Sequence, residues 1–319
     1  MTRQKLLKIL PPTLGVLVLG GVVVGLHGAL KKIGVGDVIA ALGNTPRAHI
    51  IHAVLLLGLS MALMSAYDLP GISFARRVED FPRLGLLRVG LASFCAYSLS
   101  HVLGAPALSA AAIRFRLYAQ WGVPASGIGR IVTISGTSFT AGLITLFGVM
   151  LALDPAAAPL GGDTAPLLLR GLGVALLGLS AFYVFGATRW ESVNLFGKRL
   201  ALPGTRTASS QILLAVSDIA TSGAILYSVL PPCDLSYPHL LGLYLAAFVS
   251  GLFSGIPGGV GVFDSVLLLG LSDYLSPADA LGAILLFRVM YFLIPATLGG
   301  LCYAGHEFWV HAGGADKGK

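Results

Sequence analysis

Charged side chains are scarce in this sequence of 319 residues. Asp, Glu, Lys and Arg make up only 11% of the chain, whereas hydrophobic residues make up 55% and the mean hydropathy is +0.85. An average soluble domain carries about 25% charged residues, so this share cannot cover a soluble particle of this size. The composition excludes soluble enzymes, disordered tails and nucleic-acid-binding modules, and it predicts a polytopic membrane protein. We attribute the net charge of +7 to topology and to attraction toward lipid headgroups.

Cysteine and catalytic motifs are also scarce. The three cysteines exclude a disulfide framework, and none has a Cys-x-x-Cys partner. The sequence lacks a Ser/His/Asp spacing, an H-E-x-x-H motif and a paired acidic metal motif. The glycine-rich tract Ser254–Gly261 is not followed by the Gly-Lys-Ser/Thr of a phosphate loop. We therefore expect no enzymatic activity, no cofactor and no metal site.

Long apolar runs make up most of the chain, and about 20 apolar residues cross a bilayer as a helix. The first run follows three basic residues, but it is longer than the hydrophobic region of a typical signal peptide and no Ala-x-Ala site follows. We interpret it as an uncleaved span. The sequence predicts six full spans, at Thr13–Leu30, Ile50–Tyr67, Ile128–Leu153, Leu167–Ala187, Gln211–Leu230 and Ala280–Ala304.

Two further apolar stretches, Leu84–Tyr118 and His239–Leu271, are each interrupted near the middle. The interruptions are Gly104-Ala-Pro106 and the tract Gly255–Gly261. Glycine and proline clustered inside a membrane segment end the helix, and the freed backbone groups must be shielded by protein or line a cavity. The arm after each break would be about 20 Å long as a helix, which is too short to cross the bilayer comfortably.

Basic residues in the linkers orient these segments, because cytoplasmic loops carry an excess of Lys and Arg. The linker Asp68–Arg83 carries three arginines and Thr188–Ser210 carries three arginines and one lysine, so both are predicted to be cytoplasmic. The linker Asp154–Pro166 contains neither Lys nor Arg and is predicted to be external. Only one net crossing of the membrane fits between the cytoplasmic linker Asp68–Arg83 and the external linker Asp154–Pro166. The span Ile128–Leu153 supplies this crossing. The first broken stretch is therefore expected to be a re-entrant helical hairpin that enters from the cytoplasm. By the same logic, the second enters from outside.

Folded in this way, the chain divides into two halves. Each half consists, in chain order, of two spans, one re-entrant hairpin and a third span. The halves cover approximately residues 13–153 and 167–304 and begin on opposite sides of the membrane. This layout is the inverted-topology repeat of alternating-access transporters. We therefore predict an all-α fold, a single transmembrane domain over residues 1–319 with about six full spans and two opposed re-entrant hairpins, and cytoplasmic termini.

Several ionisable residues lie deep in the apolar segments, where a charge costs about 2.5–3.5 kcal/mol and needs a partner or a wet cavity. Asp218 and Arg288 lie inside spans, and Asp264 follows the second break. Arg114 and Arg116 lie on the return arm of the first hairpin. One interpretation is an internal ion pair, such as Asp264 with Arg288, that locks the hairpin against the last span. The other is a cavity with cationic and anionic sites for a zwitterionic or headgroup-like substrate.

The two breaks are themselves candidate binding sites. Ser100 and His101 precede the first break, where a lone histidine is more often a hydrogen-bonded packing residue than a catalyst. In the second break we expect Gly258 and Gly259 to adopt backbone angles that penalise a side chain. The free amides of this break and the start of the following helix would face an anion inside the membrane.

Four motifs resemble the transmembrane region of the lysyl-phosphatidylglycerol synthase/flippase family, and the resemblance runs across nearly the whole chain. The most specific motif is the one around the second break. Two residues depart from the family pattern: His101 replaces an asparagine and Asp264 replaces a glutamate. The four motifs are Tyr67-Asp68, Ala96–Gly104 (AYSLSHVLG), Arg114–Tyr118 (RFRLY) and Gly255–Asp264 (GIPGGVGVFD).

The resemblance implies an integral flippase module that moves aminoacylated phosphatidylglycerol between the leaflets of a bacterial inner membrane. Bifunctional members append a cytosolic synthase domain that takes the amino acid from aminoacyl-tRNA. Because this sequence ends at Lys319, we expect no synthase domain and do not carry lysyl transfer over. The expected partners are membrane phospholipids and not nucleic acid. A homo-oligomer and a separate aminoacyl-phospholipid synthase stay open.

Our leading interpretation is a lipid translocase in which both hairpins line a central cavity and only the headgroup crosses. Arg114 and Arg116 would attract the lipid phosphate at the cytoplasmic mouth through charge-assisted hydrogen bonds. Arg288 would balance Asp264 in the empty site. The acidic residues that would meet an amine-bearing headgroup are Asp68, Asp218 and Asp264.

Two alternatives stay open. A proton-coupled secondary transporter of a small solute, working through Asp218 or Asp264, predicts a sealed vestibule. A non-catalytic scaffold or partner of a lipid-modifying enzyme predicts a packed interior without a cavity. A lateral opening between helices would favour a lipid.

Overall fold

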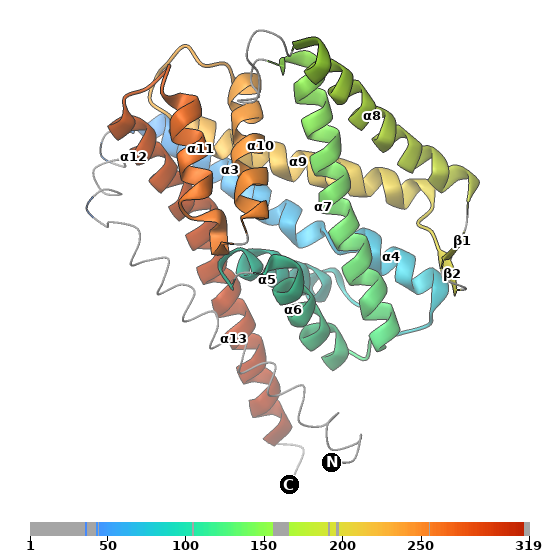
Figure 1. Cartoon of the computed structure of the whole chain (residues 1–319). Helices are drawn as coiled ribbons and strands as arrows, with labels where there is room; N and C mark the ends of the chain where they lie inside the picture. Colours follow the sequence, from blue (N-terminus) through green and yellow to red (C-terminus); the bar gives the residue numbers. More distant parts are fainter. Residues whose placement is uncertain are drawn as a thin grey trace.

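The computed structural model describes residues 36, 43, 45–103, 105–155, 166–190, 192–195, 198–254 and 256–315, and nearly all of them are helical (Figure 1). Within these described ranges, six segments are long and apolar enough to cross a membrane. The prediction of an all-α polytopic membrane protein is confirmed. The helices are α3 (Arg47–Ala66), α4 (Leu69–Val78), α5 (Leu86–Leu103), α6 (Pro106–Gln120), α7 (Ala125–Leu153), α8 (Pro166–Arg189), α9 (Thr205–Val229), α10 (Tyr237–Phe253), α11 (Val262–Leu271), α12 (Pro277–Phe287) and α13 (Ile294–Ala315).

The predicted spans correspond closely to these helices. The spans after the first match α3, α7, α8, α9 and the continuous segment formed by α12 and α13. The first predicted span, Thr13–Leu30, lies outside the described residues. The linker between α8 and α9 differs from a plain loop, because β1 (Ser192–Leu195) and β2 (Lys198–Ala201) pair there as a short antiparallel hairpin.

Both interrupted stretches form pairs of packed helices, α5 with α6 and α10 with α11. In Figure 1 the α10–α11 pair lies above the α5–α6 pair, and the two breaks face each other. A Cβ placed on Gly258 would lie 3.6 Å from the carbonyl oxygen of His101, so the tips are in close contact. The helical hairpins are therefore present, and their re-entrance into a bilayer stays a prediction.

Unusual backbone conformations mark the two tips. At the first tip Ala105 has φ +42°, a left-handed conformation that is uncommon for a residue with a Cβ. At the second tip Gly258 and Gly259 have φ +64° and +58°, which confirms the expectation for this pair. A Cβ on Gly259 would also lie 3.0 Å from the Cα of Gly251, so α10 and the break approach each other more closely than a side chain allows.

The two halves pack on each other through equivalent elements. Helix α3, which precedes the first hairpin, packs along α9, which precedes the second. Helix α5 packs on α13, and α10 packs on α7, so each hairpin contacts the span that follows the other hairpin. These reciprocal contacts are the pattern expected for two structurally equivalent halves. The inverted repeat itself stays a prediction.

The last apolar segment contains an irregular turn between α12 and α13. The residues Arg288–Leu293 form the π-helical turn η3, and Pro295 follows at the start of α13. Proline lacks an N–H and its ring clashes with the carbonyl four residues earlier, here that of Tyr291. The wider turn accommodates this proline without ending the helix, and it lies where Arg288 faces the second hairpin.

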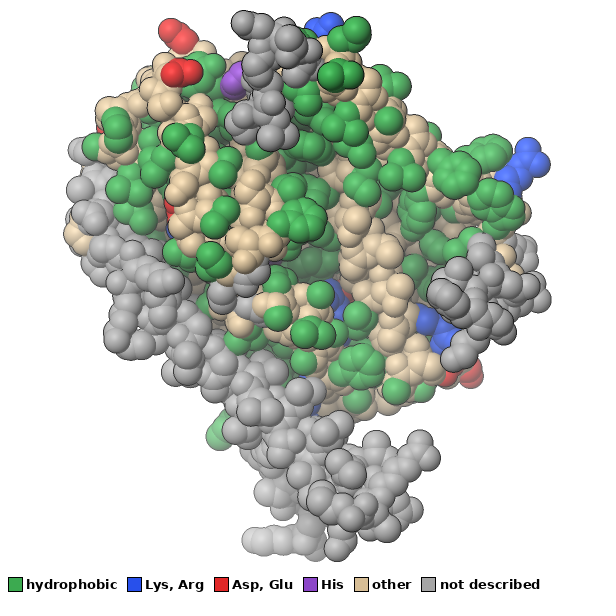
Figure 2. Space-filling model, viewed as in Figure 1, with side chains coloured by type: hydrophobic (Ala, Val, Ile, Leu, Met, Phe, Trp, Pro, Cys, Tyr) green, Lys and Arg blue, Asp and Glu red, His purple; other side chains and the backbone are tan. Residues whose placement is uncertain are grey.

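The outer surface of the bundle is predominantly apolar. Figure 2 shows hydrophobic side chains over most of the described face, with acidic and basic side chains mainly toward its edges. Helix α8 is the most exposed of the candidate spans, with only 11% of its most apolar window buried. Such a surface is stable in contact with lipid tails and would be an aggregation hazard in water.

Candidate functional site

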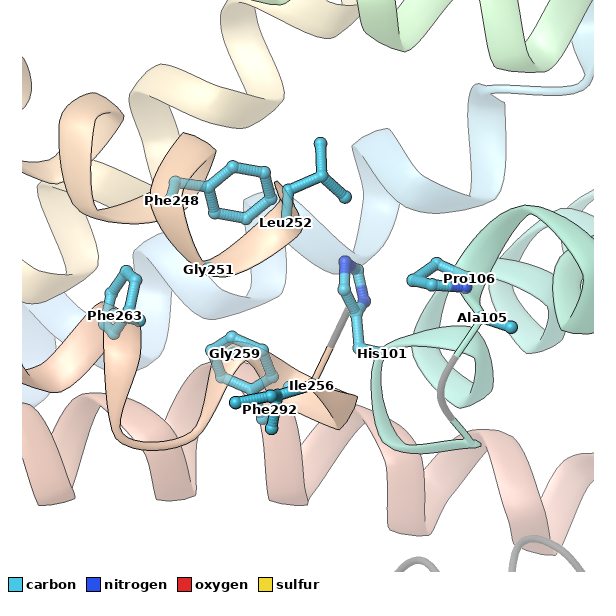
Figure 3. Close-up of a pocket in the computed structure, with 11 residues that line it drawn as sticks. His101, Ala105, Pro106, Phe248, Gly251, Leu252, Ile256, Gly259, Phe263 and Phe292 are labelled. Atoms are coloured by element: carbon cyan, nitrogen blue, oxygen red, sulfur yellow. The ribbon is translucent and has the colours of Figure 1, made fainter. Parts of the chain in front are cut away.

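A small cavity lies where the tips of the two hairpins meet (Figure 3). Its volume is about 90 Å³, and its walls include the ring of His101 from α5 and the backbone of Gly251 and Gly259 from the second hairpin. Phe248, Phe263 and Phe292 complete its apolar side. The cavity is therefore bounded by both breaks and by the π-helical turn.

The wall of this cavity reaches the outer surface of the bundle. Ala105 and Pro106 at the first tip are exposed, as are Leu252 and Ile256 at the second, with 41% and 42% of their surfaces accessible. These side chains belong to the apolar exterior, so the cavity opens at the outer surface of the bundle and is not a sealed interior.

Arg288 and Asp264 form a two-pronged ion pair beside the cavity. Nε of Arg288 donates to Oδ1 of Asp264 at 2.6 Å, and Nη2 donates to Oδ2 at 2.9 Å. Nη1 also donates to the carbonyl oxygen of Gly258 at 3.2 Å. The guanidinium lies over the rings of Phe263 and Phe292, at 5.4 and 5.5 Å from their centroids. The pairing considered from sequence is present, and it connects the last span to the second break.

Asp264 also caps α11, in whose first turn it lies. Its Oδ2 accepts a hydrogen bond from the backbone N–H of Gly261 at 2.8 Å, which satisfies one of the free donors at the start of α11. This carboxylate thus holds Arg288 and the local backbone together. An anion that displaced it from Arg288 would find a guanidinium already oriented toward the tip.

Asp68 and Arg114 form a second buried pair, between the end of α3 and α6. Nε of Arg114 lies 3.0 Å from both carboxylate oxygens, and 3% of the arginine and 0% of the aspartate are exposed. Asp68 also accepts hydrogen bonds from Tyr118 at 2.8 Å and Ser135 at 2.7 Å. The Tyr97 ring lies 4.9 Å from the guanidinium carbon. The carboxylate is fully engaged, so this site is closed to a headgroup in the present arrangement.

Arg116 is also buried and paired, with a partner that sequence reasoning missed. Its Nε donates to Oε1 of Glu307 at 2.8 Å, and Nη2 donates to Oε2 of the same carboxylate. Gln120 donates to Glu307 at 3.0 Å, and His306 lies 2.8 Å from the Gln120 oxygen. The pair joins α6 to α13. Neither Arg114 nor Arg116 is presented at an open mouth, in contrast to the expected role of attracting lipid phosphate.

The remaining candidates occupy different places. Ser100 is buried and donates to the carbonyl of Tyr97 within its own helix, so it contributes to helix packing. His101 lines the cavity and lies near the rings of Tyr291 and Phe292. Asp218 lies away from the cavity, buried between α9 and α3.

The structure therefore brings together His101, Gly258, Gly259, Asp264 and Arg288 at the hairpin tips. Asp68 and Arg114, Arg116 with Glu307, and Asp218 form three further buried polar groups. The sequence did not identify Glu307 as a site residue, because it lies at the end of a long apolar segment whose hydropathy is typical of a simple span. A signal was available, since an acidic residue in that position needs a cation on a neighbouring helix.

Comparison with known proteins finds relatives that match nearly the whole chain. No family model matches the chain. Uncharacterized protein slr0712 of Synechocystis sp. is 30% identical over 319 residues, which cover 97% of this chain and 95% of that protein. Inner membrane protein YbhN of Escherichia coli K12 is 28% identical over 276 residues, covering 86% and 85%. Phosphatidylglycerol lysyltransferase of Staphylococcus haemolyticus is 26% identical over 297 residues, covering 93% of this chain.

The chain belongs to the lysyl-phosphatidylglycerol synthase/flippase family. It aligns with 34% of the length of the Staphylococcus haemolyticus lysyltransferase, so the shared part is the flippase-like region of that protein. The similarity to YbhN and the apolar helices together make it a membrane protein of this family.

Proposed function

We propose that this family member is an integral lipid translocase, which moves phospholipid headgroups between the two leaflets at the junction of its hairpins. The observation that carries the proposal is the meeting of two broken helical hairpins at a cavity with exposed apolar side chains in its wall. Discontinuous helices that meet near the middle of a bilayer are typical of transporter binding sites. The exposed wall of the cavity lets the acyl chains stay in lipid while the headgroup passes.

The side opening favours a lipid over the two alternatives. A small-solute transporter would enclose its site on all sides, and a scaffold would have a packed interior. Here the exposed Leu252 and Ile256 form one wall of the cavity, so lipid tails can stand directly beside it. No catalytic role is proposed, since the relatives that carry an enzyme name match this chain over only about a third of their length.

The cavity is too small for a headgroup in the arrangement observed. A volume of 90 Å³ holds about three water molecules. Transport therefore requires the tips to separate, and the left-handed glycines Gly258 and Gly259 supply the backbone freedom for this movement. We interpret the structure as a closed state in which buried charges satisfy one another.

In the proposed cycle, opening exchanges protein partners for lipid partners. The lipid phosphate would take the place of Asp264 at the guanidinium of Arg288, and an amine-bearing headgroup would meet the released carboxylate. Asp68–Arg114 and Arg116–Glu307 would open and close with the first hairpin, so both arginines would reach phosphate only in an open state. With an amine-bearing headgroup, the exchange of one paired state for another keeps both charges compensated.

The name of the Staphylococcus relatives suggests the substrate class. They are phosphatidylglycerol lysyltransferases, so we propose anionic phosphatidylglycerol or its aminoacylated form as the cargo. A separate aminoacyl-phospholipid synthase would supply the modified lipid. We further propose two opposed re-entrant hairpins, inverted halves over residues 13–153 and 167–304, and cytoplasmic termini in a bacterial inner membrane.

Reconstitution tests this proposal directly. The purified chain is placed in vesicles of phosphatidylglycerol and phosphatidylethanolamine that contain a trace of NBD-labelled lipid, and dithionite then bleaches the outer leaflet. Headgroup exchange predicts that bleaching exceeds the outer-leaflet fraction, with phosphatidylglycerol or lysyl-phosphatidylglycerol moving faster than phosphatidylethanolamine. Bleaching equal to that of protein-free vesicles for every lipid would contradict the translocase.

A further inference from the structure

Asp218 is a buried carboxyl group with no cationic partner among the described residues. It lies in the middle of α9 with 4% of its surface exposed. The hydroxyl of Ser60 on α3 donates a hydrogen bond to its Oδ1 at 3.0 Å. Within the part of the chain that the structure describes, no Lys, Arg or His forms an ion pair with it.

The other buried acidic residues provide a sharp contrast. Asp68 is paired with Arg114 and Glu307 with Arg116, and Asp264, which is partly buried, is paired with Arg288. Every buried arginine that the structure describes is thus already taken by one carboxylate. Asp218 is left without a counter-charge, and a proton is the simplest way to neutralise a carboxylate in an apolar interior.

Tyrosine hydroxyls are the titratable groups that face Asp218. They come from Tyr67 at the end of α3, Tyr97 on α5, Tyr244 on α10 and Tyr291 on η3. Helices α4, α7, α8 and α12 also pack on α9, and none of them places a charged side chain in an ion pair with Asp218. Among the residues that the structure describes, the surroundings of Asp218 therefore offer hydrogen-bonding groups and no cation in an ion pair with it.

We propose that Asp218 is a proton-binding site that couples lipid movement to the transmembrane proton gradient. In the closed arrangement the carboxyl group is protonated. When the hairpins separate toward one side of the membrane and water enters, the carboxyl gives its proton to a water molecule on that side. It takes a proton from water on the opposite side, when the bundle opens there, before it returns to the closed arrangement. This inference rests on the proposed translocase function, because it assigns the energy source of that same movement.

The position of Asp218 explains how its proton could control the hairpins. The tyrosines around it belong to both hairpins, α5 and α10, and to the π-helical turn that carries Arg288. The hydroxyl of Tyr244 is also 2.8 Å from that of Ser222 on α9. A negative charge on the Asp218 side chain would require hydration, so ionisation favours an arrangement in which these elements have moved apart and water has entered.

Infrared spectroscopy tests the proton independently of transport. The full chain in lipid vesicles should show a carbonyl stretch of a protonated carboxyl group in an apolar environment, and this band should disappear as the pH is raised. Asp218→Asn should remove the band at every pH. The exposed Asp273→Asn serves as the matched control and should retain it. Ser60→Ala should keep the band but shift it to higher frequency, because the carbonyl oxygen loses one hydrogen bond.

The transport assay tests the coupling. Exchange of NBD-phosphatidylglycerol is measured with and without an imposed pH gradient. The native chain and Asp273→Asn should respond to the gradient, and Asp218→Asn should lose the response or the exchange altogether. An unchanged infrared band in Asp218→Asn, or an unchanged response to the gradient, would overturn the proposal.

The two proposals fail in different ways. If the native chain moves no lipid under any gradient but shows the Asp218-dependent band, the translocase fails and the protonated site stands. If lipid moves but the gradient has no effect on the native chain, the translocase stands and the coupling is wrong.

Discussion

The guanidinium of Arg288 donates hydrogen bonds to both carboxylate oxygens of Asp264 and, through its third nitrogen, to the carbonyl oxygen of Gly258. One guanidinium thus fixes the break of the second hairpin, the start of α11 and the last span in a single arrangement. The same contacts show what must change if the tips are to separate. Its role can be tested by removing either partner or both.

Asp264→Asn and Arg288→Gln should each reduce the amount of folded protein in the membrane. Losing one partner of a buried ion pair costs about 3–5 kcal/mol in soluble proteins, because the other charge is left uncompensated. The double variant should recover abundance, since neither charge is then stranded. Quantitative immunoblotting of membrane fractions provides the measurement.

Lipid exchange by the double variant separates a structural pair from a substrate site. A pair that only locks the hairpin predicts recovery of exchange together with abundance. The proposed site predicts abundance without exchange, because the headgroup has lost both counter-charges. Strictly additive losses of abundance would argue against pairing in the membrane.

Replacing both Gly258 and Gly259 by leucine should abolish exchange while the protein still inserts. Both residues have positive φ, which costs a residue with a side chain about 1–2 kcal/mol each, and Gly259 faces the backbone of Gly251 at contact distance. Gly171→Leu on the exposed surface of α8 is the control, because nothing lies within 4 Å of its position. Lipid exchange at the native rate by the double leucine variant would mean that this glycine tract only packs against its neighbours and has no role in transport.

Cysteine labelling tests the re-entrant hairpins. In a background without Cys95, Cys233 and Cys302, a cysteine at the exposed Ala119 should react with an impermeant maleimide only from the cytoplasm. A cysteine at Ser272, after α11, should react only from outside. Reaction of the Ala119→Cys variant from outside would mean that the first hairpin crosses the bilayer, and the inverted repeat would fail with it.

Glu307→Gln should destabilise the contact between α6 and α13. The change strands the buried Arg116 and should lower the free energy of unfolding by about 3–5 kcal/mol. Glu79→Gln is a matched control, because its pair with Arg130 is partly exposed and should contribute no more than about 1 kcal/mol. Unfolding in detergent, followed by tryptophan fluorescence, compares the two. Equal losses would mean that Arg116 finds water or another partner.

Hydropathy and helix breakers predicted most of the fold. The apolar runs located α3, α7, α8 and α9, and the glycine and proline clusters located both hairpin breaks. These features are local, because the bilayer dictates the length of a span and the backbone chemistry of glycine and proline dictates where a helix ends. The β1–β2 hairpin was not predicted, since each strand has only four residues, which is too short a window for a strand pattern to be recognised in a linker.

Side-chain partners were harder to predict than segments. Asp264 and Arg288 lie on neighbouring elements, so their pairing could be considered from sequence. Arg116 and Glu307 are 191 positions apart, and only the packing of α13 against the first hairpin brings them together. Sequence alone also placed Asp218 with the headgroup-binding residues, whereas its neighbours are a serine and tyrosines. Distances of this kind depend on tertiary packing and have no local signature.

The π-helical turn gives the last span a mechanical role. Arg288 and Glu307 are about 28 Å apart along this segment at 1.5 Å per residue, and each holds a different hairpin through one ion pair. A helical segment with one ion pair at each end can transmit a rotation from one hairpin to the other. The π-helical turn near Arg288 allows one end of the segment to rotate relative to the other. A shift of the helical register by one residue rotates the helix that follows by about 100°. The two hairpins of such a molecule need not move at the same time.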